Sequence, residues 1–174
     1  MDLHQAISLI DHDALSKKTI SAWADLGCGS GLFTNALCGL LGHGCIVYAI
    51  DKNLNVLNTI TSPTSVQIKK IKADFILDEL PVPTLNGILM ANSLHYVKDK
   101  KALLAKLQQY LKKDAVFLIV EYDTTVSNQW VPFPINFQAL GTLFSASGYH
   151  AIQKIKEQPS IYNRANIYSA IISR

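Results

Sequence analysis

Three glycines at alternating positions, Gly27, Gly29 and Gly31, follow a short apolar segment and precede an amphipathic one. A side chain at these positions would fill space that a ligand could use, or would resist the backbone angles of a tight turn. A strand, a glycine turn and a helix N-terminus together form a common site for nucleotide-like ligands. The chemistry predicted for this stretch is therefore the binding of a nucleotide or nucleoside.

An acidic residue, Asp51, lies 20 residues after Gly31, at the predicted end of the second strand. A carboxylate at this strand tip can accept hydrogen bonds from two vicinal hydroxyls of a ribose. The alternative is that Asp51 caps the helix that follows it, because aspartate is favoured at N-caps. The glycine turn lies at the right distance for a nucleoside site, so we favour ribose binding.

The spacing of the glycines argues against a dinucleotide. The dinucleotide fingerprint is G-x-G-x-x-G, whereas Leu32 occupies the place of its third glycine here. An acid directly before the turn, Asp25, would repel a pyrophosphate and would suit a cationic ligand. The ligand should therefore contain a ribose and a positive centre but no pyrophosphate, and S-adenosylmethionine fits this description.

The segment Asp25–Gly31 resembles motif I of the class I S-adenosylmethionine-dependent methyltransferases, and the resemblance extends over almost the whole chain. Lys72-Ala73-Asp74-Phe75 looks like the family's segment after strand 3, whose acid meets the adenine amino group. Asn86–Val97 looks like the family's strand 4 and the loop after it. Leu111–Asp114 departs from the usual Leu-x-Pro-Gly-Gly turn, but that turn is a connection and not part of the pocket.

The resemblance implies that S-adenosyl-L-methionine is the cofactor and that the ends of the first four strands bind it. The expected cofactor-binding residues are Asp25, Gly27, Cys28, Gly29, Gly31, Asp51, Lys52, Asp74, Phe75 and Asn92. Metal-dependent relatives would have an acid in place of Asn92, so we expect no catalytic metal.

His95 is the expected general base, because it should lie just beyond strand 4 and near the methyl group. The sulfonium methyl is already activated, so positioning of the acceptor supplies much of the acceleration. A base is needed only if the acceptor must first lose a proton. The alternative, an ordinary loop histidine, stays open.

Four aromatic residues at or after strand ends on the same edge are the expected substrate-binding residues: Tyr96, Tyr122, Trp130 and Phe133. Alternatively, Trp130 and Phe133 hold a proline-bounded loop against the core. Glu121 and Asp123 flank Tyr122, and the sequence leaves open whether they bind a polar acceptor or cap the strand.

The elements that must position these residues alternate along the chain. The predicted strands are 21–26, 45–50, 65–71, 85–91 and 115–120. The predicted helices are 2–11, 32–41 with Ser30 as N-cap, 53–60 ended by Pro63, and 136–147. A further helix is predicted between strands four and five, with Leu103, Leu104, Leu107 and Leu111 on a single apolar stripe. Two last strands, 150–156 and 166–173, are joined by a turn-like segment, 158–164, and should pair antiparallel. This order predicts an α/β, Rossmann-like, doubly wound seven-stranded sheet, mostly parallel, with an antiparallel C-terminal strand.

The 174 residues predict one domain, 1–174, in which residues 1–20 form an N-terminal helix and cap segment. The net charge of +3 lacks the strong basic bias of a nucleic-acid binder. The three cysteines have neither C-x-x-C nor Cys/His ligand spacing, so no zinc site is expected. Without a signal peptide or an apolar run of membrane-spanning length, we expect a cytoplasmic protein, a monomer or homodimer, with no membrane partner.

These features predict a small methyltransferase that acts on a small molecule by in-line displacement. An RNA or protein methyltransferase is one alternative. The absence of a cysteine after strand 4 and of an Asn/Asp-Pro-Pro-aromatic motif disfavours nucleic acid without excluding it. A non-catalytic S-adenosylmethionine-binding module is a second alternative. A nicotinamide oxidoreductase is a third, and the glycine spacing disfavours it.

Overall fold

The computed structural model describes residues 1–15, 20–61, 65–160 and 165–174. In this part of the chain the helices are α1 (Leu3–Ile10), α2 (Leu32–Leu40), α3 (Leu54–Asn58), α4 (Lys100–Leu107) and α5 (Phe137–Ser145), with 3-10 turns η1 (Leu94–Tyr96) and η2 (Gln108–Tyr110). The strands are β1 (Ala22–Leu26), β2 (Ile46–Asp51), β3 (Gln67–Lys72), β4 (Leu85–Ala91), β5 (Leu111–Tyr122), β6 (Ala151–Pro159) and β7 (Asn166–Ser173).

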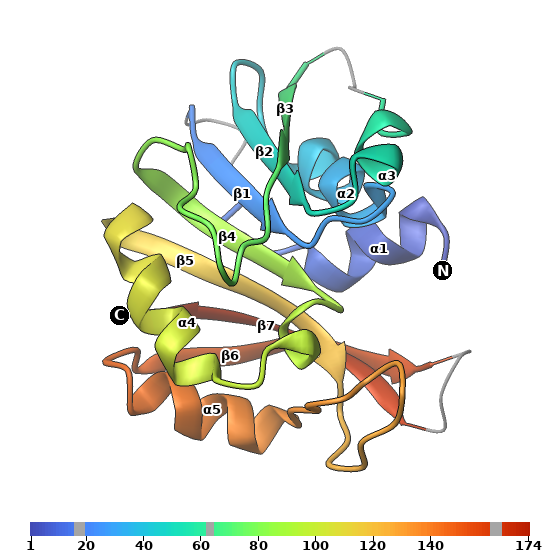
Figure 1. Cartoon of the computed structure of the whole chain (residues 1–174), viewed down its shortest axis with the longest axis vertical. Helices are drawn as coiled ribbons and strands as arrows, with labels where there is room; N and C mark the ends of the chain where they lie inside the picture. Colours follow the sequence, from blue (N-terminus) through green and yellow to red (C-terminus); the bar gives the residue numbers. More distant parts are fainter. Residues whose placement is uncertain (16–19, 62–64, 161–164) are drawn as a thin grey trace.

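The strands form one seven-stranded sheet in the order β3-β2-β1-β4-β5-β7-β6 (Figure 1). Strands β1 to β5 run parallel to one another, and β7 is antiparallel to both β5 and β6. This is the predicted fold. The strand order reverses between β1 and β4, and ligands of open α/β sheets bind outside the carboxyl ends of the strands at such a reversal.

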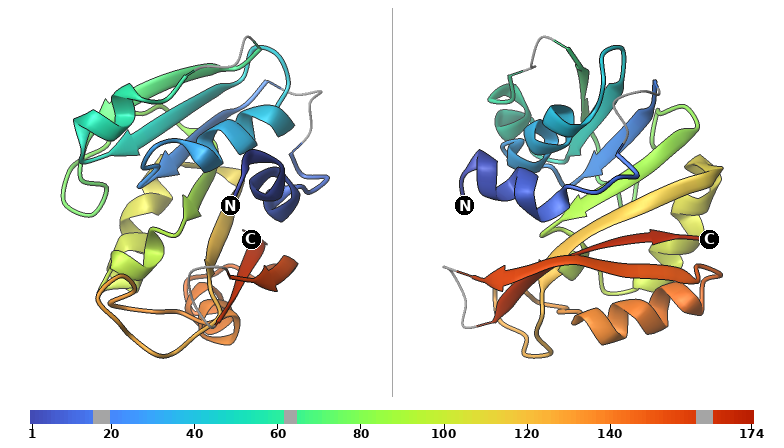
Figure 2. Two further views of the ribbon diagram at one scale, coloured as in Figure 1. Left: turned by 90° about the vertical axis from the view of Figure 1, so that its right-hand side faces the viewer. Right: turned by 180° about the vertical axis from the view of Figure 1, so that it is seen from behind.

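Helices cover both faces of the sheet, because the central strands are apolar on both sides (Figure 2). In β4, Ile88 and Met90 pack into the core under α4 and α5, whereas Leu89 packs into the core under α1 and α2. These side chains are fully buried. The two cores fix the strand ends from which the loops of the site emerge.

Several predicted boundaries differ from the structure. Gly31, not Ser30, is the N-cap of α2, and it lies in the left-handed region with φ 85°. Leu111 belongs to β5 and pairs with Leu85, because the η2 turn ends the α4 segment before it. Gln158 and Pro159 belong to β6 rather than to a turn. Proline is tolerated there because β6 is an edge strand, and Pro159 pairs with Asn166.

Some predictions fall outside the described residues. These are Pro63 as the end of the third helix, residues 161–164 of the turn before the last strand, and residues 16–19 of the N-terminal segment. The third helix itself is shorter than predicted, and Asn53 is its N-cap.

Candidate functional site

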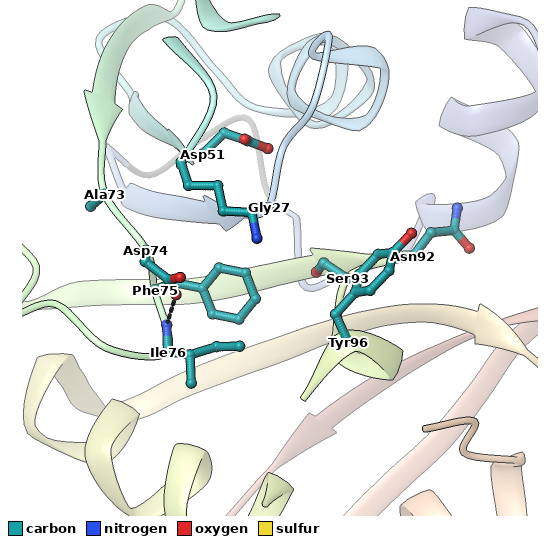
Figure 3. Close-up of a pocket in the computed structure, with 10 residues that line it drawn as sticks. Gly27, Asp51, Ala73, Asp74, Phe75, Ile76, Asn92, Ser93 and Tyr96 are labelled. Carbon is teal, nitrogen blue, oxygen red and sulfur yellow. Dashed lines mark hydrogen bonds between the residues drawn. The ribbon is translucent and has the colours of Figure 1, made fainter. Parts of the chain in front are cut away.

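A cavity of about 200 Å³ lies at the carboxyl ends of β1, β2, β3 and β4 (Figure 3). It is lined by Gly27, Asp51, Lys52, Ala73, Asp74, Phe75, Ile76, Asn92, Ser93 and Tyr96. Six of the ten expected cofactor-binding residues are in this lining. The others, Asp25, Cys28, Gly29 and Gly31, form the turn beside it and lie outside the lining.

The turn requires glycine for two reasons. Gly27, Gly29 and Gly31 all have positive φ, at 73°, 53° and 85°. A Cβ atom on Gly27 would lie 2.7 Å from the Cβ of Ser93, and one on Gly31 would lie 2.7 Å from Ile60. Glycine therefore keeps the backbone close to the end of β4 and leaves the cavity open.

Backbone amides of two loops hold the Asp51 carboxylate. Its Oδ2 accepts a hydrogen bond from the N–H of Gly29 at 2.9 Å, and its Oδ1 accepts one from the N–H of Asn53 at 2.8 Å. Asp51 does not cap α3, because Asn53 does. Each oxygen keeps lone-pair capacity, so the carboxylate is oriented and still able to accept from ligand hydroxyls.

Asp74 and Phe75 line the same cavity after β3. The Oδ1 of Asp74 accepts from the N–H of Ile76 at 2.9 Å, which fixes the carboxylate at the start of the loop. Figure 3 shows the Phe75 ring on one side of the space and the Tyr96 ring on the other. An aromatic ring beside an oriented carboxylate suits a planar base that carries an amino group.

Asp25 lies beneath the turn and is 1% exposed. Its Oδ2 accepts from the Thr34 hydroxyl at 2.6 Å. Burial raises the pKa of this carboxyl from 3.8 to about 7, the Thr34 hydrogen bond opposes the shift, and the charge of Asp51 adds to it. Asp25 thus joins β1 to α2 through its side chain.

Three buried polar atoms in the described part of the chain have no hydrogen-bond partner: Asp25 Oδ1, Asn92 Oδ1 and Ser93 Oγ. They belong to residues at or just after the ends of β1 and β4. Buried acceptors without partners are rare and indicate a missing donor. The ammonium group of an amino-acid moiety is such a donor, so these residues fit a nucleoside that carries an amino acid.

Asn92 lies where three cavities of the described structure meet. Among the described residues it is the only one other than glycine with a positive φ, 53°. It lines the cavity at β1–β4 and also two further cavities beside it. Strained backbone of this kind concentrates at functional sites.

His95 and Glu121 form a buried pair at the ends of β4 and β5. The Nδ1 of His95 lies 2.7 Å from Oε2 of Glu121, and the backbone N–H of His95 donates to Oε1 at 3.0 Å. The two residues are 2% and 1% exposed. A carboxylate only accepts, so Nδ1 is the donor of this hydrogen bond, and Nε2 is the ring nitrogen left for a ligand. The sequence did not decide whether Glu121 binds a polar acceptor or caps the strand. The only signal in the sequence was its place as an acid directly after a predicted apolar strand.

A second cavity, of about 510 Å³, adjoins the first at Asn92 and Tyr96. Its lining is Asn92, His95, Tyr96, Tyr122, Asn128, Trp130 and Val131. Three of the four expected substrate-binding aromatics are therefore together. We name it the aromatic cavity.

Phe133, the fourth aromatic, is outside the described lining of this cavity. Its N–H donates to the carbonyl of His95 at 3.0 Å, and its own carbonyl accepts from Nζ of Lys100 at 2.7 Å. Phe133 thus holds the loop after β5 against η1. The sequence left two roles open for this loop, lining the acceptor pocket or holding the loop against the core. Trp130 has the position for lining the pocket, and Phe133 has the position for holding the loop.

Two further observations concern other kinds of site. In the described ranges, no group of three or more His, Cys, Asp or Glu side chains is arranged to hold a metal ion. None of the helices there is long and apolar enough to cross a membrane.

Comparison with known proteins gives one family. A family model described as "Methyltransferase domain" matches residues 4–165. No curated protein matches the sequence significantly.

Several solved structures are similar in fold. YcgJ from Bacillus subtilis has a TM-score of 0.71 at 14% identity, over 98% of this chain and 99% of that one. A SAM-dependent methyltransferase from Aquifex aeolicus has a TM-score of 0.64 at 18% identity, over 100% of both chains. Human N-acetylserotonin methyltransferase, solved with SAM, has a TM-score of 0.70 at 17% identity, over 98% of this chain and 51% of that one.

Proposed function

The chain belongs to the methyltransferase-domain family, and from this membership we propose that it transfers the methyl group of S-adenosylmethionine to a small-molecule acceptor. It is an S-adenosylmethionine-dependent methyltransferase, as the motif I resemblance predicted. The acceptor class and the roles of individual residues are our proposal. The observation that carries it is the buried His95–Glu121 pair at the wall of a cavity that meets the glycine-turn cavity at Asn92.

We assign the cofactor to the cavity at the ends of β1 to β4. Asp51 accepts from the ribose hydroxyls, and Asp74 and Phe75 hold the adenine. Asp25, Ser93 and Asn92 offer their unpartnered oxygens to the ammonium group. Gly27, Gly29, Gly31 and Cys28 shape the turn, and Lys52 flanks the ribose end. The cofactor supplies a methyl group on a sulfonium centre, which is activated for displacement without further help.

His95 acts as general base toward the acceptor. The Glu121 carboxylate holds Nδ1 as the donor, which leaves Nε2 to remove a proton from an acceptor hydroxyl or amine. With S-adenosylmethionine bound, its sulfonium methyl would be the group that this deprotonated acceptor receives. Tyr96, Tyr122 and Trp130 orient the acceptor for this in-line attack, and Phe133 supports the loop.

Three features favour a small molecule. The aromatic cavity has the size of a small-ligand site. No Asp, Glu, Lys or Arg side chain occurs in its described lining. The acceptor named for one structural neighbour, N-acetylserotonin, is also small. We further propose that residues 1–174 act as one domain, since the described strands belong to one sheet.

Methyl transfer from labelled S-adenosylmethionine into a fractionated cell extract tests the function. We expect label in the small-molecule fraction. An Asp51→Ala variant, which should not hold the cofactor, is the control for label that arises without the site. Label confined to RNA or to protein would support those acceptor classes instead. Cofactor binding without label in any fraction would indicate a non-catalytic module.

A further inference from the structure

Lys106, in the last turn of α4, holds the loop that follows β3. Its Nζ donates to the carbonyl of Phe75 at 3.3 Å, to the carbonyl of Ile76 at 3.2 Å and to the carbonyl of Asp78. An ammonium group has three N–H donors, so these three carbonyls use all of them. Among the described residues, the ion pairs do not include Lys106. The partners of this lysine are therefore backbone carbonyls of a single loop.

The same loop is closed by hydrogen bonds of its own. The N–H of Asp78 donates to the carbonyl of Asp74 at 2.8 Å, and Oδ2 of Asp78 accepts from the N–H of Asp74 at 2.8 Å. The N–H of Leu77 donates to the same Asp74 carbonyl at 3.1 Å. These bonds use amide donors of the loop, so other carbonyls of the loop need a donor from elsewhere, and Lys106 supplies it.

The loop carries the two residues that the proposed function assigns to the adenine. Asp74 and Phe75 line the cavity at the ends of β1 to β4, where Figure 3 shows both side chains. Lys106 lies outside the described lining of that cavity. It contacts the backbone of Phe75 rather than the space that the ring faces. Lys106 can therefore affect the cofactor only through the shape of the loop.

The two ends of this segment have other anchors. At the start, the N–H of Ala73 donates to the carbonyl of Asp51 at 3.1 Å. At the end, the hydroxyl of Tyr110 in η2 accepts from the N–H of Leu80 at 3.0 Å. Lys106 holds the middle of the segment, between these anchors. Loss of its ammonium group should therefore loosen the middle and leave β3 and α4 in place.

An anion site is the competing interpretation of this lysine. Lys106 and Lys98 line a further cavity, of about 510 Å³, and two lysines would attract a phosphate. However, the three N–H donors of Lys106 already have carbonyl acceptors. Asp99, in the same lining, would repel an anion. The contacts thus favour a lysine that holds the loop over one that waits for an anion.

We propose that Lys106 is a positioning residue for the adenine of S-adenosylmethionine. It holds the loop in the shape in which the Asp74 carboxylate and the Phe75 ring meet the base. This inference rests on the proposed function, which assigns the adenine to these two residues. It adds that the preference of the site for adenine depends on a lysine of α4 that does not touch the cofactor.

The test compares two ligands that differ only at the base. The first is S-adenosylhomocysteine, and the second is its 6-deamino analogue, which carries purine in place of adenine. A carboxylate that accepts from the adenine amino group loses this bond with the analogue. The wild-type protein should therefore bind S-adenosylhomocysteine about 10-fold more tightly than the analogue. Calorimetry gives the two dissociation constants, and their ratio measures the preference for adenine.

Lys106→Met removes the three donors and keeps a long side chain of similar helix propensity. We expect the ratio of the dissociation constants to fall by at least about 3-fold, because the loosened loop no longer holds the carboxylate against the amino group. Lys101→Met is the matched control, since Lys101 is an exposed residue of the same helix, and it should leave the ratio unchanged. A smaller folded fraction would weaken both ligands alike, so the ratio separates positioning from stability.

Asp78→Ala is a second variant, which removes the Oδ2 acceptor of the Asp74 N–H and so opens the same loop at an exposed position. It should also lower the ratio, and it decides the question if Lys106→Met does not fold. An unchanged ratio in a folded Lys106→Met, or in Asp78→Ala, would overturn this inference and leave the cofactor assignment in place. A wild-type protein that binds neither ligand, or both equally, would overturn the adenine assignment and this inference with it. Methyl transfer is not measured here, so a failure of the proposed catalysis is distinguishable from both results.

Discussion

The two halves of the proposed site, one assigned to the cofactor and one to the acceptor, are built in different ways. In the cofactor half, at the ends of β1 to β4, carboxylates are held by backbone amides of nearby loops, as Asp51 is by Gly29 and Asn53. In the acceptor half, at the ends of β4 and β5, side chains hold one another across long sequence separations, as His95 and Glu121 do. The first half therefore depends on local backbone shape, and the second on how the sheet brings distant side chains together.

The largest expected effect tests the acceptor half. His95→Ala should lower kcat by about 10²–10⁴-fold, the usual contribution of a general base, without changing cofactor affinity. Initial rates and calorimetry with S-adenosylhomocysteine measure the two quantities. His150→Ala, at an exposed position, is the control. Weaker cofactor binding with unchanged kcat would reject the base role and would make both halves cofactor sites.

Glu121→Gln refines this prediction. The amide cannot accept from both N–H groups of His95 as a carboxylate does, so the ring loses its orientation. We expect kcat to fall less than in His95→Ala. The KM values for S-adenosylmethionine and for the acceptor should stay unchanged. A lower free energy of unfolding together with raised KM values would instead make Glu121 a packing residue.

The second effect tests the cofactor half. Asp51→Ala removes an oriented carboxylate, whose hydrogen bonds to two hydroxyls contribute roughly 1.5–3 kcal/mol each, so cofactor affinity should fall by about 100-fold or more. Calorimetric titration with S-adenosylhomocysteine checks this. Asp114→Ala, at an exposed position of β5, should bind normally. Normal affinity in Asp51→Ala would remove the ribose role.

The third effect separates backbone shape from side-chain chemistry. Gly27→Ala forces a Cβ into the left-handed region and against Ser93, and should destabilise the fold by about 1–2 kcal/mol from backbone strain alone. It should also narrow the cofactor cavity. In Gly141→Ala, within α5, the added Cβ meets nothing within 4 Å, and this variant should gain about 0.5–1 kcal/mol. Chemical denaturation measures both, and equal shifts would show that the turn tolerates a side chain.

The last effect concerns the dependence of stability on pH. The folded Asp25 carboxyl keeps its proton up to its raised pKa of about 7, whereas the unfolded chain loses it near 3.8. The folded state therefore binds more protons in this window, and this group makes stability fall as pH rises from about 4 to about 7. Asp25→Asn should remove that fall. The stability difference between variant and wild type should grow by more than about 1.4 kcal/mol between pH 5 and pH 8.

Thermal unfolding of both proteins across that range checks the prediction. Parallel curves at every pH would mean that Asp25 ionises normally in the folded protein. Thr34→Val is a useful companion, because it removes the hydroxyl that donates to Asp25. This variant should raise the pKa of the Asp25 carboxyl further and make stability fall more strongly as the pH rises.

Most of the fold could be predicted, because its information is local and periodic. The continuous apolar run of β2 and the alternating burial partners within β4 require a parallel sheet covered on both faces. The errors fall at element ends. Leu111 matched the apolar stripe of a helix, yet it begins β5 because pairing with Leu85 extends the strand. Pairing between distant strands leaves no periodic trace at a boundary.

The sequence alone determined the glycine turn, the strand-tip acids and the methyl donor, because a tight turn and a carboxylate at a strand end act through a few adjacent residues. Tertiary structure alone decided the partner of His95, the different positions of Trp130 and Phe133, and the meeting of three cavities at Asn92. These depend on which strands lie side by side. The β1/β4 reversal and the antiparallel β7 bring together residues that are up to about the whole chain apart, and spacing in the sequence carries no record of that approach.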